Sequence, residues 1–317
     1  MKLRPAGSPR GAPAGHRPSA VLMVAVTATW GLCFVLIQWG LRDAPVLWFA
    51  ALRSSVAGAA LLAYGMARKR SSPRTPRDWG LVGALALTNA GLAFAAMFGG
   101  VAGLSTGVAA VLANAQPLLI LLPAWWLYRE PVSAPAAVAM VAGFFGLIVV
   151  AGPGDGGTGA VLSLVAAAAM TAGTLLARRA GHLDVVMVSA WHFLLGGVGL
   201  TLVAWAVDGT PRISWTARFL AALAVLALLG TAWAFLIWFR EAQRSPLGTL
   251  TAWTFLTPVF GVGFGFVLLG ERPGGWTLAG LGLVLIALGF VLRPPRAARP
   301  ASLDRVREPA ARPPFAP

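Results

Sequence analysis

Long apolar runs, separated by short links that hold Pro, Gly or charged residues, make up most of the chain. A helix that crosses the hydrocarbon layer of a bilayer needs about 20 apolar residues. The acidic residues lie between the runs or in the terminal segments, as expected when the runs lie in lipid. We therefore predict an all-α membrane protein with ten transmembrane helices. The expected spans are residues 20–41, 45–67, 79–99, 103–127, 134–152, 158–178, 184–207, 217–239, 246–270 and 274–292.

Lys and Arg residues are distributed unevenly over the links. If the N-terminus is cytoplasmic, the links and tails on that side hold twenty of them and the links on the other side hold four. An excess of Lys and Arg in cytoplasmic loops orients membrane proteins. Both termini are therefore expected to be cytoplasmic, and the tails 1–19 and 293–317 are expected to be disordered because they are rich in Pro, Arg and Ala.

One pattern occurs twice. In "QPLLILLPAWWLYREP" Pro117 is followed thirteen positions later by Glu130, and in "TPVFGVGFGFVLLGERP" Pro258 is followed thirteen positions later by Glu271. A single proline in a membrane helix is often tolerated, because neighbouring groups satisfy the freed backbone. Two prolines at matched positions favour a repeated unit instead, with Pro117 and Pro258 marking helix breaks that serve in gating.

Each half of the chain holds five expected spans, an odd number, so the second half must cross the membrane in the opposite sense. The expected units are residues 20–152 and 158–292. Inverted repeats of this kind are the architecture of many secondary transporters, which bind their substrate at the repeat interface beside interrupted helices.

The repeated segments resemble those of the drug/metabolite transporter superfamily, specifically its EamA-like ten-helix carriers. "TATWGLCF" is similar to the first-helix Trp-Gly pattern of that family, and "ALRSSVAG" to its second-helix arginine. The chain departs from the family at Ser54, where an aromatic residue often follows the arginine, and "TAGTLLARR" echoes the first helix only loosely. The resemblance spans residues 20–292. It implies a secondary carrier, in the export direction, of small organic solutes such as amino acids, metabolites or drugs.

Arg53 is the one charged residue well inside an expected span. A charge at the bilayer centre is costly and usually faces a cavity or a partner. Arg53 lies eight residues after Pro45, which places it roughly 12 Å below the outer surface at ~1.5 Å per residue. It is expected either to bind a substrate carboxylate or to bond helix-end carbonyls; the alternative is a side chain that extends outward to the interface.

Four further polar side chains lie deep in expected spans. Asn114 and Gln116 flank the Pro117 break, Thr257 precedes Pro258, and Asn89 lies on the third span. Hydrogen bonds between helices could explain each of them alone. We nevertheless predict that all four line a substrate site.

Many of the thirteen tryptophans fall at span ends, as in an interfacial belt. Trp30, Trp233 and Trp253 lie deeper. Trp30 is the expected pocket residue, because the adjacent Gly31 permits close helix approach, whereas the other two are expected to pack in the core. The expected belt residues are Trp39, Trp48, Trp79, Trp125, Trp126, Trp205, Trp215, Trp238 and Trp276.

His192 is the only histidine in an expected span and could relay a proton near neutral pH. The competing interpretation is a hydrogen-bonded interfacial histidine beside Trp191. Glu130 and Glu271, at helix ends, are expected to form solvated salt bridges or caps, and Cys33 is expected to be a packing residue.

Several function classes are disfavoured. The expected spans hold no interior carboxylate for proton coupling, and no GxxxxGK[ST] loop for ATP occurs. The net charge of +15 lies in loops rather than on a basic helix face, so nucleic acid is not an expected partner. No cofactor or metal is expected; the partners are a small solute and the bilayer. The alternatives are a membrane scaffold or sensor and an integral membrane enzyme, the latter lacking paired carboxylates or a His or Cys cluster. A composition rich in Ala, Gly, Pro and Arg favours a bacterial plasma (inner) membrane.

Overall fold

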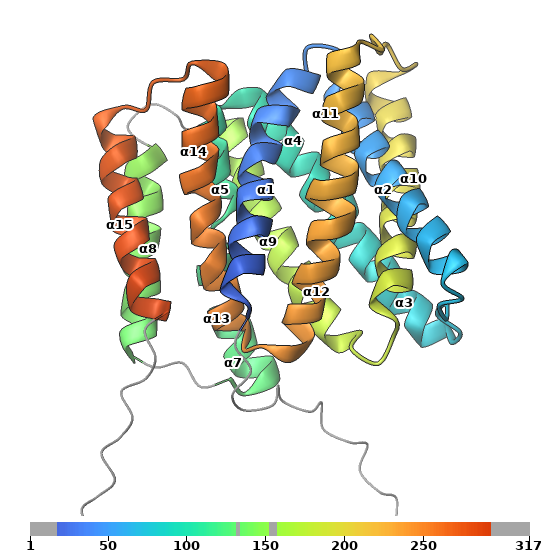
Figure 1. Ribbon diagram of the computed structural model, residues 1–317, viewed down its shortest axis with the longest axis horizontal. Coiled ribbons are helices and arrows are strands. Elements are labelled where there is room, and N and C mark those ends of the chain that lie inside the picture. Colours follow the sequence, from blue (N-terminus) through green and yellow to red (C-terminus); the bar gives the residue numbers. More distant parts are fainter. Residues whose placement is uncertain (1–17, 131–133, 152–156, 293–317) are drawn as a thin grey trace, which may run out of the picture.

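The computed structural model describes residues 18–130, 134–151 and 157–292, and every regular element in these residues is a helix (Figure 1). The expected N-terminal tail, except for its last two residues, and the whole expected C-terminal tail lie outside the described residues. The α-helices are α1 (Ala20–Gly40), α2 (Val46–Ala67), α3 (Pro76–Leu85), α4 (Ala93–Gly103), α5 (Thr106–Ala113), α6 (Gln116–Leu119), α7 (Leu121–Tyr128), α8 (Ala134–Ala151), α9 (Thr158–Arg179), α10 (Val185–Asp208), α11 (Ala217–Ala227), α12 (Ala234–Arg244), α13 (Leu247–Ala252), α14 (Leu256–Leu269) and α15 (Gly275–Leu292).

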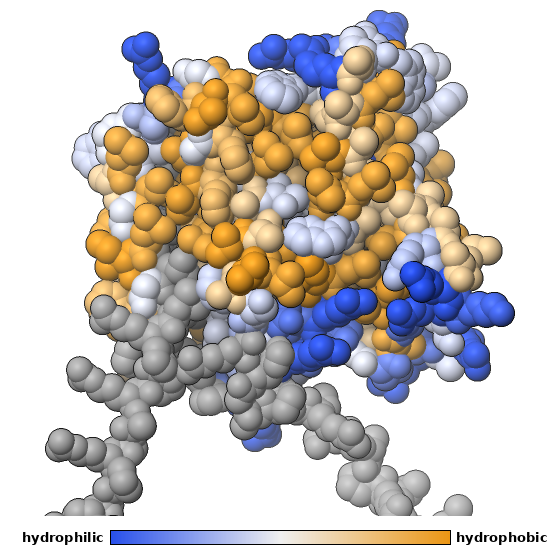
Figure 2. All heavy atoms as spheres, in the orientation of Figure 1, coloured by the Kyte–Doolittle hydropathy of each residue, from blue (hydrophilic) through white to orange (hydrophobic). Residues whose placement is uncertain are grey.

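Within the described part of the chain, eight helical segments are long and apolar enough to cross a membrane. Four of them are single helices (α1, α2, α9 and α10), and four are built from consecutive pieces: 76–103, 106–128, 217–244 and 247–269. The helices α8 and α15 have 18 residues each and pack side by side at one edge of the molecule (Figure 1). Figure 2 shows apolar residues around the middle of one face, with hydrophilic residues gathered above and below them, as a bilayer requires.

The two halves of the chain match at one constant separation in sequence, that of Pro117 and Pro258, which we call the repeat offset. The segments 217–244 and 247–269 begin and end at the repeat offset from the segments 76–103 and 106–128. The N-cap threonines Thr75 and Thr216 have the same separation, and each accepts a hydrogen bond from the backbone N–H three residues on. Because a cap and a helix length recur together, the repeat predicted from two proline motifs extends over the local structure of both halves.

Irregular helix geometry also recurs in the two halves. A π-helix covers Ala86–Leu92 between α3 and α4, and a second covers Leu228–Trp233 between α11 and α12, with their last residues separated by the repeat offset. π-Helical turns inside α-helices are rare and are frequently found at functional sites. Neither π-helix was predicted from the sequence.

Both proline-containing spans are interrupted shortly before the proline. The helix α5 ends at Ala113, and α6 starts at Gln116, next to Pro117. In the second half, α13 ends at Ala252 and a 3₁₀ turn, Trp253–Phe255, leads into α14 and Pro258. A proline is readily accommodated in the first turn of a helix, where its missing N–H has no intrahelical partner.

The spans α7 and α14 end in equivalent left-handed residues, Arg129 with φ 53° and Gly270 with φ 68°. Glycine adopts this conformation without a steric penalty, whereas a residue with a Cβ does not. Arg129→Gly is therefore expected to raise the free energy of unfolding by about 0.5–1 kcal/mol. The reverse change, Gly270→Arg, is expected to lower it. Thermal denaturation in detergent measures both, and a lower midpoint for Arg129→Gly would contradict the strain argument.

The tryptophan belt is partly as expected. Trp125, Trp126, Trp205, Trp215 and Trp276 are at least 58% exposed, and Trp79 is 37% exposed. The expectation was wrong for Trp238, which is 2% exposed, because its helix continues to Arg244 instead of ending near residue 239. Trp48 lies at a span end but is also buried, with its indole N–H donating to the Gly209 carbonyl.

Candidate functional site

All six side chains predicted to bind a substrate line one internal cavity. They come from both halves of the chain: Trp30, Arg53, Asn89, Asn114, Gln116 and Thr257. The space open to the centres of water-sized spheres is about 30 Å³. On this measure one water needs roughly 10–15 Å³, so the cavity has room for about two waters. This space is smaller than an organic solute.

The two helix interruptions bring three of these residues to the cavity. Asn114 is the C-cap residue that follows α5, and its side-chain amide donates to the Ala110 carbonyl at 2.6 Å. Thr257 lies in the first turn of α14, and its hydroxyl is buried with no hydrogen-bond partner among the described residues. The helix breaks therefore place polar groups in the cavity wall.

Gln116 is held in place by the second half of the chain. Its amide nitrogen donates to the hydroxyl of Thr174 on α9 at 2.7 Å, and the indole N–H of Trp238 donates to the same hydroxyl at 3.1 Å. The Thr174 hydroxyl in turn donates to the Met170 carbonyl at 3.0 Å. This network uses both hydrogen-bonding roles of one threonine and fixes the side chain of Gln116 at the cavity.

Arg53 is 2% exposed, so it does not extend outward to the interface. Its Nε donates to Thr231 Oγ1 at 2.8 Å, and Nη2 donates to the Gly230 carbonyl at 3.4 Å. The guanidinium carbon lies 4.4 Å from the centre of the Phe94 ring. The third nitrogen, Nη1, is buried without a partner among the described residues. Arg53 thus bonds a helix carbonyl, one of the two expected roles, and still has a nitrogen to offer a ligand.

The carbonyl that Arg53 contacts is made available by a π-helix. Gly230 lies within the π-helix Leu228–Trp233, and its carbonyl accepts from both Arg53 and the indole of Trp30. A Cβ on Gly230 would lie 2.4 Å from the sulfur of Cys33. Glycine is required here because the helix backbone approaches Cys33 and Arg53 closely.

Asn89 occupies the equivalent position in the other π-helix, since Gly230 follows it by the repeat offset. Its amide nitrogen lies 3.4 Å from Nε2 of His192, whose Nδ1 lies 2.9 Å from the Val188 carbonyl. A carbonyl only accepts and an amide nitrogen only donates, so these contacts fit a neutral ring protonated on Nδ1. His192 is fully buried rather than interfacial, and it lies behind Asn89, outside the cavity lining.

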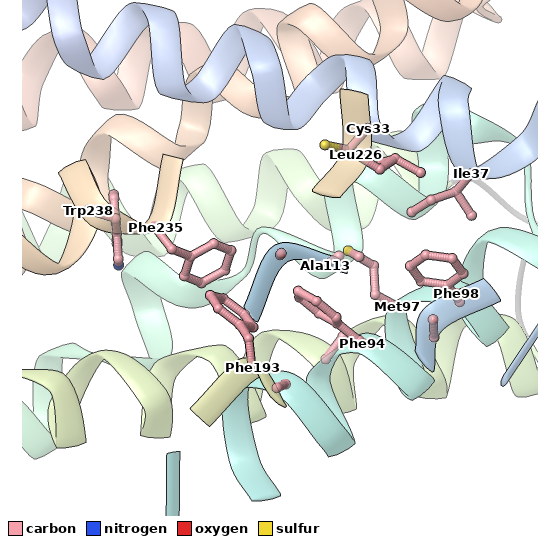
Figure 3. Packing of buried hydrophobic residues seen from close by; sticks show 14 of the residues in the cluster. Cys33, Ile37, Phe94, Met97, Phe98, Ala113, Phe193, Leu226, Phe235 and Trp238 are labelled. Carbon is pink, nitrogen blue, oxygen red and sulfur yellow. The ribbon is translucent and has the colours of Figure 1, made fainter. Parts of the chain in front are cut away.

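Aromatic rings close much of the remaining wall. Trp30 contacts Trp238 edge-on with ring centroids 5.1 Å apart, and contacts Phe235 at 5.5 Å. Behind them, Phe94, Phe193 and Phe235 form a cluster, with Phe235 edge-on to Phe193 (Figure 3). Each such pair stabilises the fold by about 0.5–1.5 kcal/mol in addition to the hydrophobic contribution of the area that it buries.

Pro117, Pro258 and His192 are not among the lining residues. The lining includes eight residues that the sequence analysis did not assign to the site: Cys33, Phe34, Met97, Ala113, Met170, Thr174, Phe235 and Trp238. Cys33 is 2% exposed and packs in the core as expected, although it also borders the cavity. Among residues 18–130, 134–151 and 157–292, no cluster of His, Cys, Asp or Glu side chains could hold a metal ion.

The comparison with known families agrees with this architecture. The sequence profile of the EamA-like transporter family matches residues 17–152 and again 157–293, so two copies cover most of the chain. The chain belongs to the EamA-like transporter family. Together with its apolar helices, this makes the protein a multi-pass membrane transporter.

Two curated proteins are similar to this chain over most of their own lengths. An uncharacterized transporter of Synechocystis sp. is 25% identical over 297 residues, which cover 86% of this chain and 89% of the relative. The probable amino-acid metabolite efflux pump of Escherichia coli is 24% identical, with 87% and 94% covered. A solved crystal structure shares the fold, with a TM-score of 0.71 at 18% identity, covering 87% of this chain and 97% of that one.

Proposed function

We propose that this transporter exports small organic solutes that carry an anionic group, such as amino acids, by alternating access between two inverted repeats. One observation carries the proposal: Nη1 of Arg53, a buried cation in the cavity wall, has no partner among the described residues. A buried donor left unpaired costs about 1–3 kcal/mol, more when it is charged. A carboxylate offers the acceptor that this nitrogen lacks. The E. coli relative, named as an amino-acid metabolite efflux pump, supports the same substrate class and direction.

In this proposal the other lining residues have distinct roles. Asn89, Asn114, Gln116 and Thr257 make polar contacts with the solute, and Trp30 walls the apolar part of the site. The helix breaks next to Pro117 and Pro258 allow the half-helices to move as the cavity expands from its closed volume. Interrupted helices beside a midplane site are a common basis of alternating access.

The membrane arrangement completes the proposal. With α8 and α15 as the fifth and tenth spans, the chain has ten transmembrane helices and both termini on the cytoplasmic side of a bacterial plasma membrane. The two units are then residues 20–152 and 158–292, and the lipid bilayer and the solute are the partners. The proposed role is transport and not catalysis, without a cofactor.

The proton relay through His192 stays a prediction, and it requires a change in the hydrogen bond between His192 and Asn89. Once Nε2 of His192 is protonated, it can only donate a hydrogen bond and no longer accepts one from the Asn89 amide nitrogen. The Asn89 amide would then have to turn this nitrogen away from the ring. A relay therefore requires Asn89 to change its orientation at the cavity. In this way proton uptake would be linked to solute binding.

Flux into proteoliposomes tests the proposed function. We expect purified protein to exchange radiolabelled amino acids, drawn from a pooled set, at a saturable rate well above that of empty liposomes. Cationic dyes form the comparison set, because the Trp30–Trp238 wall alone would suit them by cation–π contact. The proposal is contradicted if dyes move and amino acids do not, or if no solute in either pool moves faster than in empty liposomes.

A further inference from the structure

Two glutamates connect the halves of the molecule at opposite ends of a helix pair. Glu130, just after α7, accepts a hydrogen bond through Oε2 from the backbone N–H of Leu247, the first residue of α13, at 2.8 Å. Glu271, just after α14, accepts through Oε1 from the backbone N–H of Thr106, the first residue of α5, at 3.1 Å. The C-terminal end of each span thus lies at the N-terminal end of the other, so the two spans run antiparallel.

The Glu130–Leu247 and Glu271–Thr106 contacts join equivalent positions of the two repeats. Leu247 follows Thr106, and Glu271 follows Glu130, by the same repeat offset that relates the helices. In both spans the glutamate N–H also closes the preceding helix, through the carbonyl of Ala124 or Gly265. A carboxylate at a helix N-terminus is stabilised by free backbone N–H groups and by the helix dipole. The expected cap role is therefore realised between the halves and not within one helix.

The contact at Glu130 is much stronger than its counterpart. Arg178, at the end of α9, forms an ion pair with Glu130, and both side chains are at most 15% exposed. The same guanidinium donates to the carbonyls of Ala242, at 2.7 Å, and Ser245, at the end of α12. Among the described residues, Glu271 has no such ion pair. Four helix ends, those of α7, α9, α12 and α13, are joined at the Glu130 side, but only two spans are joined at the Glu271 side.

We propose that these glutamates are a pair of latches that control opening of the cavity from opposite faces, and that the Glu271 latch releases more easily. The inference rests on the proposed alternating access. Opening at one end separates a helix of one half from a helix of the other, which breaks the glutamate contact at that end and leaves the other closed. Both contacts are made in the present structure, consistent with its small cavity. Since Arg178 strengthens only the Glu130 latch, the unloaded protein opens more often at the Glu271 end.

Cys33 provides a native probe of opening. It is the only cysteine in the chain, it lines the cavity, and it is 2% exposed in the closed state. A membrane-impermeant, sulfonated methanethiosulfonate is applied to one face of protein-containing vesicles at a time, and the rate of Cys33 labelling is measured. The assay needs no transported solute. A failure of the latch proposal is thus distinguishable from a failure of the transport proposal.

The latch proposal predicts three results for the rate of Cys33 labelling. Glu271→Ala raises the labelling rate from one face about tenfold or more, as expected for loss of a hydrogen bond to a charged group. Glu130→Ala raises it from the opposite face. The wild type is labelled faster from the face at which Glu271→Ala acts. If both variants act at the same face, or if folded, monodisperse variants label at the wild-type rate from both faces, the glutamates are caps only and the proposal is overturned.

Glu130→Ala leaves Arg178 without its carboxylate partner and could therefore fail to fold. Two further variants keep the proposal testable in that case. Glu130→Gln keeps an oxygen for the Leu247 N–H, and Thr106→Pro removes the backbone N–H that donates to Glu271 while the glutamate itself stays in place. Proline fits at the first position of a helix, and the Thr106 hydroxyl that is lost has no partner among the described residues. Thr106→Pro must reproduce the face and direction of Glu271→Ala; labelling that is unchanged or faster from the other face would overturn the proposal.

Discussion

Replacing Arg53 by alanine is expected to abolish amino-acid flux while the protein still inserts into the membrane. Removing one partner of a buried, hydrogen-bonded charge pair costs about 2–5 kcal/mol. That cost corresponds to at least about thirtyfold in solute affinity. The guanidinium also holds Thr231 and the Gly230 carbonyl, so the wall of the cavity loses part of its own order. Proteoliposome flux, normalised to the amount of folded protein, measures the loss.

Two control variants separate charge from shape and from position. Arg53→Lys keeps the charge but cannot bond Thr231 and a carboxylate with the same planar fork, so we expect flux that is reduced but measurable. Arg70→Gln removes an arginine that is paired with Asp184 at the surface and is not among the cavity-lining residues, and it should leave flux unchanged. Equal flux in Arg53→Ala and wild type would show that Arg53 is structural and that the aromatic wall is the better basis for recognition.

Gly31→Val is expected to destabilise the fold more than any other single change considered. A Cβ at Gly31 would lie 2.8 Å from the backbone nitrogen of Gly261, 2.9 Å from the Thr257 carbonyl and 2.6 Å from Phe260 Cβ. Two of these atoms are backbone, so α1 and α14 would have to separate. Overpacking of this kind costs typically about 1–3 kcal/mol and occasionally more. Flux should fall as well, because Trp30 and Thr257 face the cavity from these two helices.

Gly199→Val is the matched control, because Gly199 lies on α10 and a Cβ there meets nothing within 4 Å. Thermal denaturation in detergent, followed by gel filtration, should show a large drop in midpoint for Gly31→Val and little change for Gly199→Val. Equal midpoints for Gly31→Val and wild type would mean that the two helices are not in the close contact described.

Much of the site was predictable because polar residues are costly in lipid. Arg53, Asn89 and Gln116 stand out in apolar runs, and Gly31 beside Trp30 indicated a close helix contact. Thr174 carried no such signal, since nothing in its Ala-rich helix distinguishes it from neighbouring threonines. Its role depends on Gln116 and Trp238, which lie 58 and 64 residues away in the chain.

Other features depend on backbone geometry that composition does not record. The π-helices have no residue signature, yet the repeat offset, applied to Asn89, leads directly to Gly230. The end of α12 was placed too early because Arg240, Glu241 and Arg244 were interpreted as a link. The helix continues through these residues, since Ala242 on the same turn is buried and the carbonyls of Ala242 and Ser245 are satisfied by Arg178.

The central claim is that solute crosses the membrane through the cavity beside Arg53. The most direct test measures flux and Cys33 alkylation by a small maleimide in the same proteoliposomes, with and without a transported amino acid. The account predicts that the amino acid slows alkylation in a saturable manner, and that protein alkylated at Cys33 no longer transports it. Full transport by completely alkylated protein would contradict the account, because the adduct on Cys33 would occupy the cavity that the solute must enter.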